Sequence, residues 1–188
     1  MGDVPPDPRV TASRTVYENK WMRLREDRFE RADGSEGLYA VVDKSPATAV
    51  IAIDGDEVVL VEQYRHPVGE RFWELPQGAW DGEDAPDSEQ LARGELAEET
   101  GLRAGSLERL GRLYFAYGIT GQPFDVWLAT DLTQGEQDLE PEEEGLRVGR
   151  FALAHAEAMI LDGTIMDSAT VAAFGLLRMR RPDLLPPS

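Results

Sequence analysis

Hydrophobic and polar positions along the first half of the chain form short apolar runs separated by turn residues. Runs of roughly four to eight β-branched and aliphatic residues between such turns are typical of buried strands. The segments that fit are 17–30, where the pattern is mixed, 38–42, 47–53 and 58–61. Asp54 and Gly55 stand between the last two segments, and an Asp-Gly pair in that position favours a tight turn. We therefore expect a β-hairpin centred on these two residues.

A helix is predicted between Asp87 and Gly101. Asp87 stands where the N-cap belongs, and Gln90 three residues later completes a pair that resembles a capping box. Gly101 follows Thr100 at the position where a left-handed residue commonly ends a helix. The segment 77–86 before this helix contains glycines, a proline and acids, and is therefore expected to be a loop.

The rest of the chain alternates strands and helices, which is typical of an α/β protein. Strands are expected at 72–75, 107–115, 124–130 and 148–153, and helices at 154–161 and 168–180. An acidic loop is expected at 134–145. No repeat or linker divides the sequence, so we expect one α/β domain over residues 13–188, preceded by a flexible tail at 1–12.

The composition narrows the range of functions. The 188 residues are 41% hydrophobic and 29% charged, which is typical of a globular domain. The absence of cysteine excludes disulfides, thiolate metal sites and cysteine nucleophiles. The net charge of −17, from 36 acids and 19 bases, disfavours nucleic acid and anionic membranes as partners. No apolar run is long enough to span a membrane and no signal-peptide core is present, so we expect a cytoplasmic protein.

Three glutamates gather on one face of the predicted helix. At about 100° per residue, Glu95, Glu98 and Glu99 fall within an arc of roughly 100°. Like charges at this spacing repel one another by roughly 0.2–0.5 kcal/mol per pair on an exposed helix, and by more when buried. The face is therefore either a solvated acidic surface or a site for a hard cation such as Mg²⁺ or Mn²⁺, which take carboxylate oxygens and bridge to phosphates.

The sequence around these glutamates resembles the signature of the Nudix hydrolase family. In that signature a glycine, a glutamate and an arginine precede a helix of the form Glu-apolar-x-Glu-Glu-x-Gly-apolar. Residues 95–102, Glu-Leu-Ala-Glu-Glu-Thr-Gly-Leu, match its second half. Residues 73–78, Trp-Glu-Leu-Pro-Gln-Gly, resemble the strand and turn that lead into it, with Gly78 as the opening glycine. The resemblance implies a Nudix-type α/β/α sandwich with a mixed central sheet and an N-terminal β extension at 13–46.

Two positions depart from the signature. Gly94 stands where the signature has its arginine, and Arg93 lies one position earlier. Ten residues separate Glu83 from Gly94 where the signature has seven, so its first glutamate corresponds to Glu83 or Asp84. In the family this glutamate and the arginine mainly brace the loop and the helix. The departures therefore affect that bracing more than the metal site.

The resemblance covers most of the chain from about Val16 and implies further site residues. Residues 59–65 are similar to a strand of ADP-ribose pyrophosphatases, in which the arginine at the place of Arg65 contacts the substrate. Residues 142–148 resemble the acidic loop that closes over the metals there, which implies that Glu142 is the general base and Glu144 a metal ligand. Residues 165–170 resemble the segment that opens the last helix.

The same resemblance implies a metal and a base-stacking site. The implied metal ligands are Glu95, Glu99 and the backbone carbonyl of Gln77, with Glu98 as a ligand or orienting catalytic group, and the implied ion is Mg²⁺ or Mn²⁺. Trp73 and Tyr117 are candidates to stack on the base of a nucleotide, although aromatic residues beside strands more often belong to the core.

The implied reaction is attack of water on the diphosphate bond of ADP-ribose or another nucleoside diphosphate sugar, which gives a nucleoside monophosphate and a sugar phosphate. ADP-ribose pyrophosphatases often carry Ser-Pro-Gly after the signature, whereas residues 116–118 are Ala-Tyr-Gly, so other nucleotide sugars stay open as substrates. The long strand region before Ala47 is similar to the dimer-forming extension of sugar-nucleotide hydrolases. The expected partners are therefore a small nucleotide sugar and a second copy of the chain.

Two alternatives stay open. The first is a Nudix hydrolase of dinucleoside polyphosphates, capped RNA or nucleoside triphosphates. The acidic charge disfavours RNA, and the N-terminal extension disfavours the small triphosphate hydrolases. The second is a Nudix module that binds a nucleotide without cleaving it. Gly94 and the lengthened loop favour this module, but the intact Glu95, Glu98 and Glu99 disfavour it.

Overall fold

The computed structural model describes residues 6–80, 87–139 and 141–185, apart from the side chain of Glu142. These residues form two compact units. The first comprises the chain up to Pro46 together with Tyr114–Pro123, and the second comprises Ala47–Leu113 and the chain from Phe124 onward. The boundaries fall at the ends of strands. No linker-like stretch of sequence marks these boundaries, so the division into two units was not predicted.

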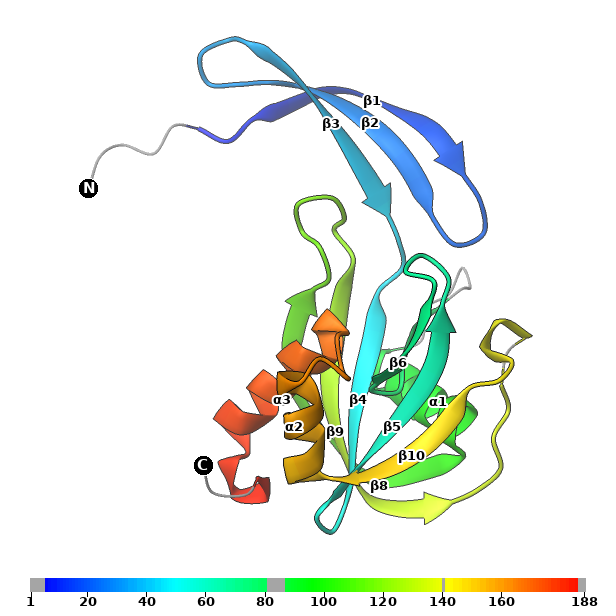
Figure 1. Cartoon of the computed structure of the whole chain (residues 1–188). Helices are drawn as coiled ribbons and strands as arrows, with labels where there is room; N and C mark the ends of the chain where they lie inside the picture. The colour runs from blue at the N-terminus through cyan, green and yellow to red at the C-terminus, as the bar shows by residue number, and fades with distance from the viewer. Residues whose placement is uncertain (1–5, 81–86, 140, 186–188) are drawn as a thin grey trace. The chain divides into compact units, whose positions relative to one another are not determined.

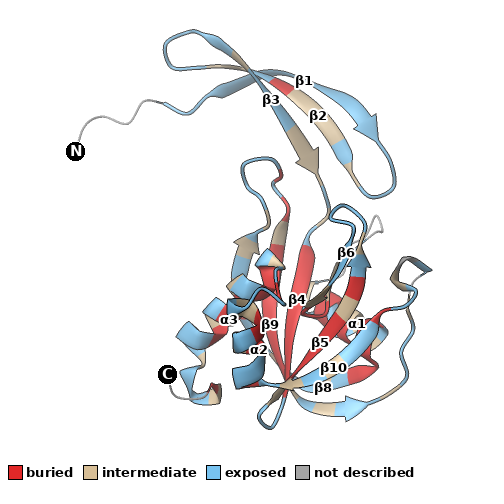
Figure 2. Cartoon of the chain, in the orientation of Figure 1, coloured by how far each residue is buried: buried red, intermediate tan, exposed pale blue. Residues whose placement is uncertain are grey.

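The first unit is an antiparallel sheet of three strands in the order β1-β2-β3 (Figure 1). The strands are β1 (Arg9–Glu18), β2 (Arg23–Glu30) and β3 (Glu36–Asp43). Residues 9–12 thus belong to a strand and not to the flexible tail expected at 1–12. Figure 2 shows β1 exposed along its whole length. The Val42 N–H donates to the Ile119 carbonyl (2.9 Å), which ties the segment Tyr114–Pro123 to β3.

The second unit is built on a seven-stranded mixed sheet. Its strands are β4 (Ala47–Asp54), β5 (Glu57–Arg65), β6 (Glu70–Glu74), β7 (Gln77–Ala79), β8 (Leu102–Tyr114), β9 (Pro123–Gln134) and β10 (Arg147–Ala152). The strand order is β10-β5-β4-β9-β8, with β6 paired to β5 and β7 paired to β4. Strand β4 is antiparallel to β5 and parallel to β9, so the predicted mixed central sheet is confirmed.

In the part of the chain that the structure describes, three α-helices cover this sheet: α1 (Ser88–Thr100), α2 (Leu153–Leu161) and α3 (Ser168–Arg180). Figure 1 shows α1 on one face and α2 and α3 on the other. Val50 of β4 packs in a core cluster with Leu96 of α1. Side chains alternate along a strand, so the neighbouring Ile51 faces the opposite layer, where it is also fully buried. The predicted α/β/α sandwich is thereby confirmed.

The buried face of α1 holds its charged face in place. Leu96 is fully buried, and complete burial of a leucine stabilises a fold by roughly 1.5–3 kcal/mol. That exceeds the few tenths of a kcal/mol that each exposed pair of like charges costs a helix. Figure 2 shows where the sheet is buried: β4, β5 and β9 carry most of its buried residues.

The predicted hairpin turn and the predicted caps of α1 are confirmed. Gly55 has a positive φ of 65° between β4 and β5, at the predicted hairpin. The Asp87 side chain accepts from the Gln90 N–H (2.8 Å), and Gly101 ends α1 with φ 72°. The loop expected at 77–86 is wrong for Gln77–Ala79, which form β7, and residues 81–86 lie outside the described residues. No helix within the described ranges is long and apolar enough to cross a membrane.

Candidate metal centre

Three carboxylates from two parts of the second unit converge at the end of the acidic loop. One oxygen each of Glu95, Glu99 and Glu143 lies within 4.8 Å of the other two. Helix α1 supplies the first two, because residues four apart share a helix face. The short 3₁₀ helix Pro141–Glu143 supplies the third. Clustered carboxylate oxygens are the ligands that Mg²⁺ and Mn²⁺ prefer.

Glu99 carries a buried oxygen without a partner among the described residues. Its Oε2 accepts from the Gln77 N–H (3.1 Å), whereas no described residue bonds its buried Oε1. Burial raises the pKa of Glu99 well above its usual value, and the charges of Glu95 and Glu143 raise it further. An unpartnered carboxylate oxygen beside like charges is unfavourable in a protein interior unless a proton or a cation joins it. These residues therefore fit a divalent metal ion.

Gly78 of β7 leaves the space that the Glu95 carboxylate occupies. A Cβ at residue 78 would overlap the carboxylate carbon and both oxygens of Glu95. The backbone of β7 is fixed, because Gly78 lies opposite Thr48 in the pairing with β4. The glycine that opens the signature therefore allows the carboxylate of Glu95 to approach the backbone closely.

Glu98 lies on the exposed side of α1 beside the acidic loop. Partial desolvation raises its pKa, and the nearby charges of Glu143 and Asp138 raise it further. Glu98 is outside the group of three converging carboxylates formed by the described residues. A role as an orienting group fits this position better than a role as a ligand in that group.

The acidic loop is held at both ends. At its start, the Asp138 N–H donates to the Glu98 carbonyl (3.1 Å), next to a bond from Gln137 Nε2 to the Glu99 carbonyl (2.5 Å). At its end, Arg71 Nη2 donates to the Gly145 carbonyl (2.5 Å). Both anchors restrict the route of the loop past the helix that carries the glutamates.

The structure brings a different acid to the cluster from the one that the sequence suggested. Glu143 joins Glu95 and Glu99, whereas Glu144 is exposed and outside the group. The side chain of Glu142, the expected general base, lies outside the described residues. The sequence shows several adjacent acids here, and only the three-dimensional route of the loop selects among them.

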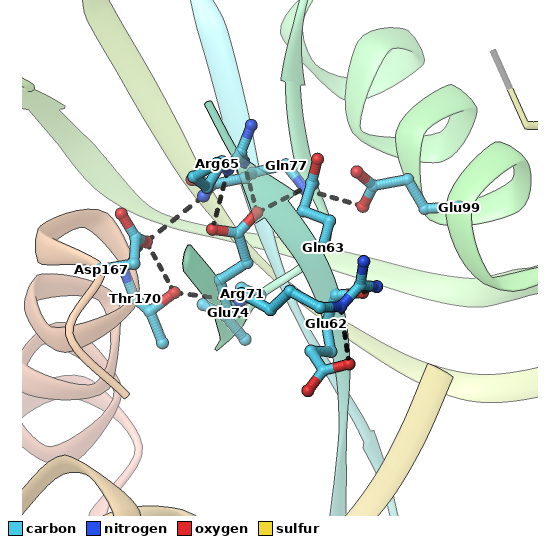
Figure 3. Close-up of polar contacts among 10 residues, drawn as sticks. Glu62, Gln63, Arg65, Arg71, Glu74, Gln77, Glu99, Asp167 and Thr170 are labelled. Carbon is cyan, nitrogen blue, oxygen red and sulfur yellow. Dashed lines mark hydrogen bonds and ion pairs between the residues drawn. The ribbon is translucent and has the colours of Figure 1, made fainter. Parts of the chain in front are cut away.

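Arg65, the expected substrate contact, is held by a buried acid that the sequence analysis missed. Its guanidinium pairs with Glu74 of β6, and the two side chains are 39% and 2% exposed. Gln63 Nε2 also donates to Glu74 Oε1 (2.9 Å), so Glu74 is fixed between two side chains of β5 (Figure 3). Burial raises the pKa of Glu74, against the opposing charge of Arg65. The sequence offered one signal for this contact: Glu74 is a charged residue between the apolar Trp73 and Leu75.

The two aromatic candidates have different surroundings. The ring of Trp73 meets that of Phe151 edge to face (centroids 4.8 Å apart) and also covers Gly149 of β10, so it packs on the sheet. Tyr117 belongs to the first unit, in the segment after β8, and is 87% exposed. The packing of Trp73 is that of a residue at the edge of the core.

The departures from the signature have local structural consequences. A Cβ at Gly94 would meet Glu98 Oε1 at an ordinary 3.7 Å, so the position has room for a side chain. Arg93 pairs with Glu89 (2.8 Å) and donates to the Ala104 carbonyl (2.7 Å), which links α1 to β8. Glu83 and Asp84 lie outside the described residues. Arg93 therefore braces the helix from a position next to the usual one.

The fold and the acidic cluster together define the class of protein: an α/β/α sandwich in which converging carboxylates of a helix and a loop fit a divalent cation. Comparison with known protein families agrees with this class. A model described as the NUDIX domain matches residues 43–169, and one described as the nucleoside diphosphate sugar hydrolase N-terminal domain matches residues 9–42. The chain belongs to the Nudix family.

Individual relatives and a solved structure extend this result. The chain is 33% identical to an ADP-ribose pyrophosphatase of Mycobacterium tuberculosis over 168 residues, which cover 88% of this chain and 81% of that protein. It is 26% identical to an ADP-ribose pyrophosphatase of Bacillus subtilis, over 92% and 93% of the two chains. A crystal structure of an ADP compounds hydrolase superposes with a TM-score of 0.81 at 22% identity, covering 95% and 96% of the chains, which supports the fold.

Proposed function

We propose that this Nudix pyrophosphohydrolase cleaves the diphosphate bond of ADP-ribose or of another nucleoside diphosphate sugar. The observation that carries the proposal is the cluster of Glu95, Glu99 and Glu143 on a Nudix fold. The match of residues 9–42 to the N-terminal domain of nucleoside diphosphate sugar hydrolases favours a sugar nucleotide over a triphosphate. The names of two relatives similar over most of their length favour ADP-ribose among these sugars.

Glu95, Glu99 and Glu143 would hold the metal ion, with Mg²⁺ as the proposed ion and Mn²⁺ as a substitute. The backbone carbonyl of Gln77 is a further proposed ligand, because the adjacent N–H of the same residue already bonds Glu99. Glu144 remains a candidate only if the loop moves, since it lies outside the cluster. When bound, such an ion neutralises phosphate oxygens and lowers the pKa of a coordinated water.

The chain itself would orient the substrate and accept a proton. Hydrolysis adds the oxygen of water to one phosphorus and leaves the bridging oxygen on the other phosphoryl group. A carboxylate of the acidic loop, Glu142 in our proposal, takes the proton of the attacking water. Glu98 orients this water. Arg65, half-exposed and fixed by Glu74, would bind a phosphate or ribose oxygen. Trp73, which belongs to the same unit as these residues, is proposed as a contact of the base.

A substrate screen tests this function. The purified protein is incubated with Mg²⁺ or Mn²⁺ and with ADP-ribose, other nucleoside diphosphate sugars, diadenosine polyphosphates or a nucleoside triphosphate, and the products are separated by chromatography. We expect a nucleoside monophosphate and a sugar phosphate, formed by the wild type and by Glu136→Gln but not by Glu99→Gln. Glu136 is an exposed acid of the same loop and serves as the matched control.

Two other outcomes would replace the proposal. Cleavage restricted to polyphosphates or triphosphates would assign the chain to another Nudix substrate class. Nucleotide binding by the folded protein without any metal-dependent cleavage would indicate a binding module.

We also propose that the chain forms a homodimer through its N-terminal sheet. Strand β1 exposes Val10, Val16 and Tyr17 (58%, 49% and 53%), and large exposed apolar patches mark protein–protein contacts. Light scattering after size-exclusion chromatography should give twice the mass of the chain. Val16→Glu should give the monomer mass, whereas Val68→Glu, at an exposed valine of the second unit, should not.

A further inference from the structure

A chain of hydrogen bonds connects the start of α3 to the proposed metal centre. Asp167 Oδ2 accepts from the N–H and from Oγ1 of Thr170 (2.8 Å each). Thr170 Oγ1 in turn accepts from the Leu75 N–H (2.9 Å), and Gln77 Nε2 donates to Asp167 Oδ2 (3.3 Å). Figure 3 shows Gln77 between Asp167 and the Glu99 side chain.

The segment Leu75–Gln77 is fixed by each of these contacts and by the sheet. The Leu75 N–H bonds α3, the Pro76 carbonyl accepts from the Val50 N–H (2.9 Å), and the Gln77 N–H bonds Glu99 Oε2 (3.1 Å). Removal of the α3 contact would leave the Leu75 N–H, on a fully buried residue, without its partner. The segment would then shift, and the donor to Glu99 would shift with it.

Helix capping alone does not require this arrangement. Asp167 caps α3 through the Thr170 N–H, and that bond needs neither the threonine hydroxyl nor Gln77. The hydroxyl of Thr170 is fully buried and is used twice, as donor to Asp167 and as acceptor from Leu75. Asp167 Oδ2 accepts from the Gln77 amide in addition to the N–H and the hydroxyl of Thr170. The extra contacts all point toward the segment that holds Glu99.

We propose that Thr170 and Asp167 are positioning residues for the metal centre, which act through the Leu75–Gln77 segment to orient the Glu99 carboxylate. The inference rests on the proposed function, because it assigns to the Glu99 carboxylate a role in binding the cation. Partners that orient metal ligands from outside the coordination sphere typically contribute about 10–100-fold to metal affinity or activity.

The test compares Thr170→Val, which removes the hydroxyl at nearly constant shape, with Thr170→Ser, which keeps it. Mn²⁺ binding is measured by electron paramagnetic resonance on the folded proteins, and thermal unfolding is measured without metal. We expect Thr170→Val to bind Mn²⁺ about 10-fold more weakly than the wild type and Thr170→Ser to bind it within about twofold. Turnover should fall in parallel for Thr170→Val, with KM for the nucleotide unchanged.

Asp167→Ser separates capping from positioning. Serine is a good N-cap but is too short to reach the Gln77 amide, so α3 should keep its stability while Mn²⁺ binding weakens several-fold. Equal Mn²⁺ affinity of wild type and Thr170→Val, or equal loss in Thr170→Val and Thr170→Ser, would overturn the positioning role while leaving the metal centre in place. A wild type that binds no Mn²⁺ would overturn the metal centre as well.

Discussion

The carboxylate of Glu95 occupies the position that a side chain on Gly78 would need. A Cβ at Gly78 would overlap all three carboxylate atoms, while the pairing of β7 with β4 holds the backbone in place. Glycine is therefore required here by a neighbouring functional group and not by backbone conformation, because residue 78 is not among those with positive φ. The relationship ties the opening glycine of the signature to a proposed metal ligand 17 positions later in the chain.

We expect Gly78→Ala to abolish most metal-dependent hydrolysis while the protein stays folded. The end of a glutamate side chain can rotate away at a cost of about 0.5–1.5 kcal/mol, so the unfolding temperature should fall by only a few degrees. The displaced Glu95 can no longer meet Glu99 and Glu143, so Mn²⁺ binding should weaken at least about 10-fold. Calorimetry and metal titration on the same sample measure both quantities.

Gly175→Ala provides the control for this prediction. Gly175 lies on the exposed face of α3, and a Cβ there meets nothing within 4 Å. Alanine inside a helix is about 0.5–1 kcal/mol more stable than glycine, so this variant should gain stability and keep full activity. A Gly78→Ala protein with wild-type metal affinity would show that Glu95 does not need the space at residue 78.

The parts of the fold that local chemistry determines were predicted from the sequence. Helix α1 begins after Asp87 and ends at Gly101 because one side chain accepts an N-terminal N–H and one glycine adopts a left-handed conformation. The four-residue spacing of Glu95 and Glu99 likewise places them together without any knowledge of the sheet.

The parts that depend on distant contacts were not predicted. Strand β7 has only three residues, two of them glycine and alanine, and is a strand because β4 pairs with it. The choice of Glu143 over its neighbours depends on the route of the loop, which Arg71 fixes through the Gly145 carbonyl. The capture of Arg65 by Glu74 depends on the pairing of β5 with β6.

Glu99→Gln should make the metal-free protein more stable than the metal-free wild type. The same variant should lack metal-dependent hydrolysis. The amide removes a buried charge beside Glu95 and Glu143, retains an acceptor for the Gln77 N–H, and can donate to the neighbouring carboxylates. Each kcal/mol of relieved repulsion should raise the unfolding temperature by about 2–4 °C. Mn²⁺, which should stabilise the wild type in proportion to its binding, should leave the variant unchanged.

The stability gained by Glu99→Gln should also increase with pH. The pKa of Glu99 is raised in the folded protein, so folding favours the protonated form and the wild type loses stability as pH rises from about 4.5 through the raised value. Glutamine does not titrate and is free of this loss. Unfolding temperatures of both metal-free proteins between pH 5 and 8 measure the difference, and a constant difference would contradict the prediction.

Asp125 of β9 should make the stability of the second unit sensitive to acid. Burial alone would raise the pKa of Asp125, but hydrogen bonds from Arg112 (2.8 Å) and Arg109 (3.0 Å) lower it from 3.8 to about 2. A lowered pKa contributes stability above pH 4 that is lost as the pH falls toward 2, here roughly 2 kcal/mol. Urea unfolding should show that Asp125→Asn costs most near pH 6 and progressively less below pH 4, whereas a cost independent of pH would assign it to packing.

Exchange of single acids in the loop should show which one belongs to the metal centre. Glu143 lies with Glu95 and Glu99, so Glu143→Gln should weaken Mn²⁺ binding about 10-fold or more and lower turnover accordingly. Glu144 is exposed and outside the cluster, so Glu144→Gln, which changes the net charge equally, should keep both within about twofold. Equal losses in the two variants would mean that the general negative charge of the loop attracts the ion. A loss confined to Glu144→Gln would assign the ligand role to Glu144, as the resemblance to the acidic loop implies.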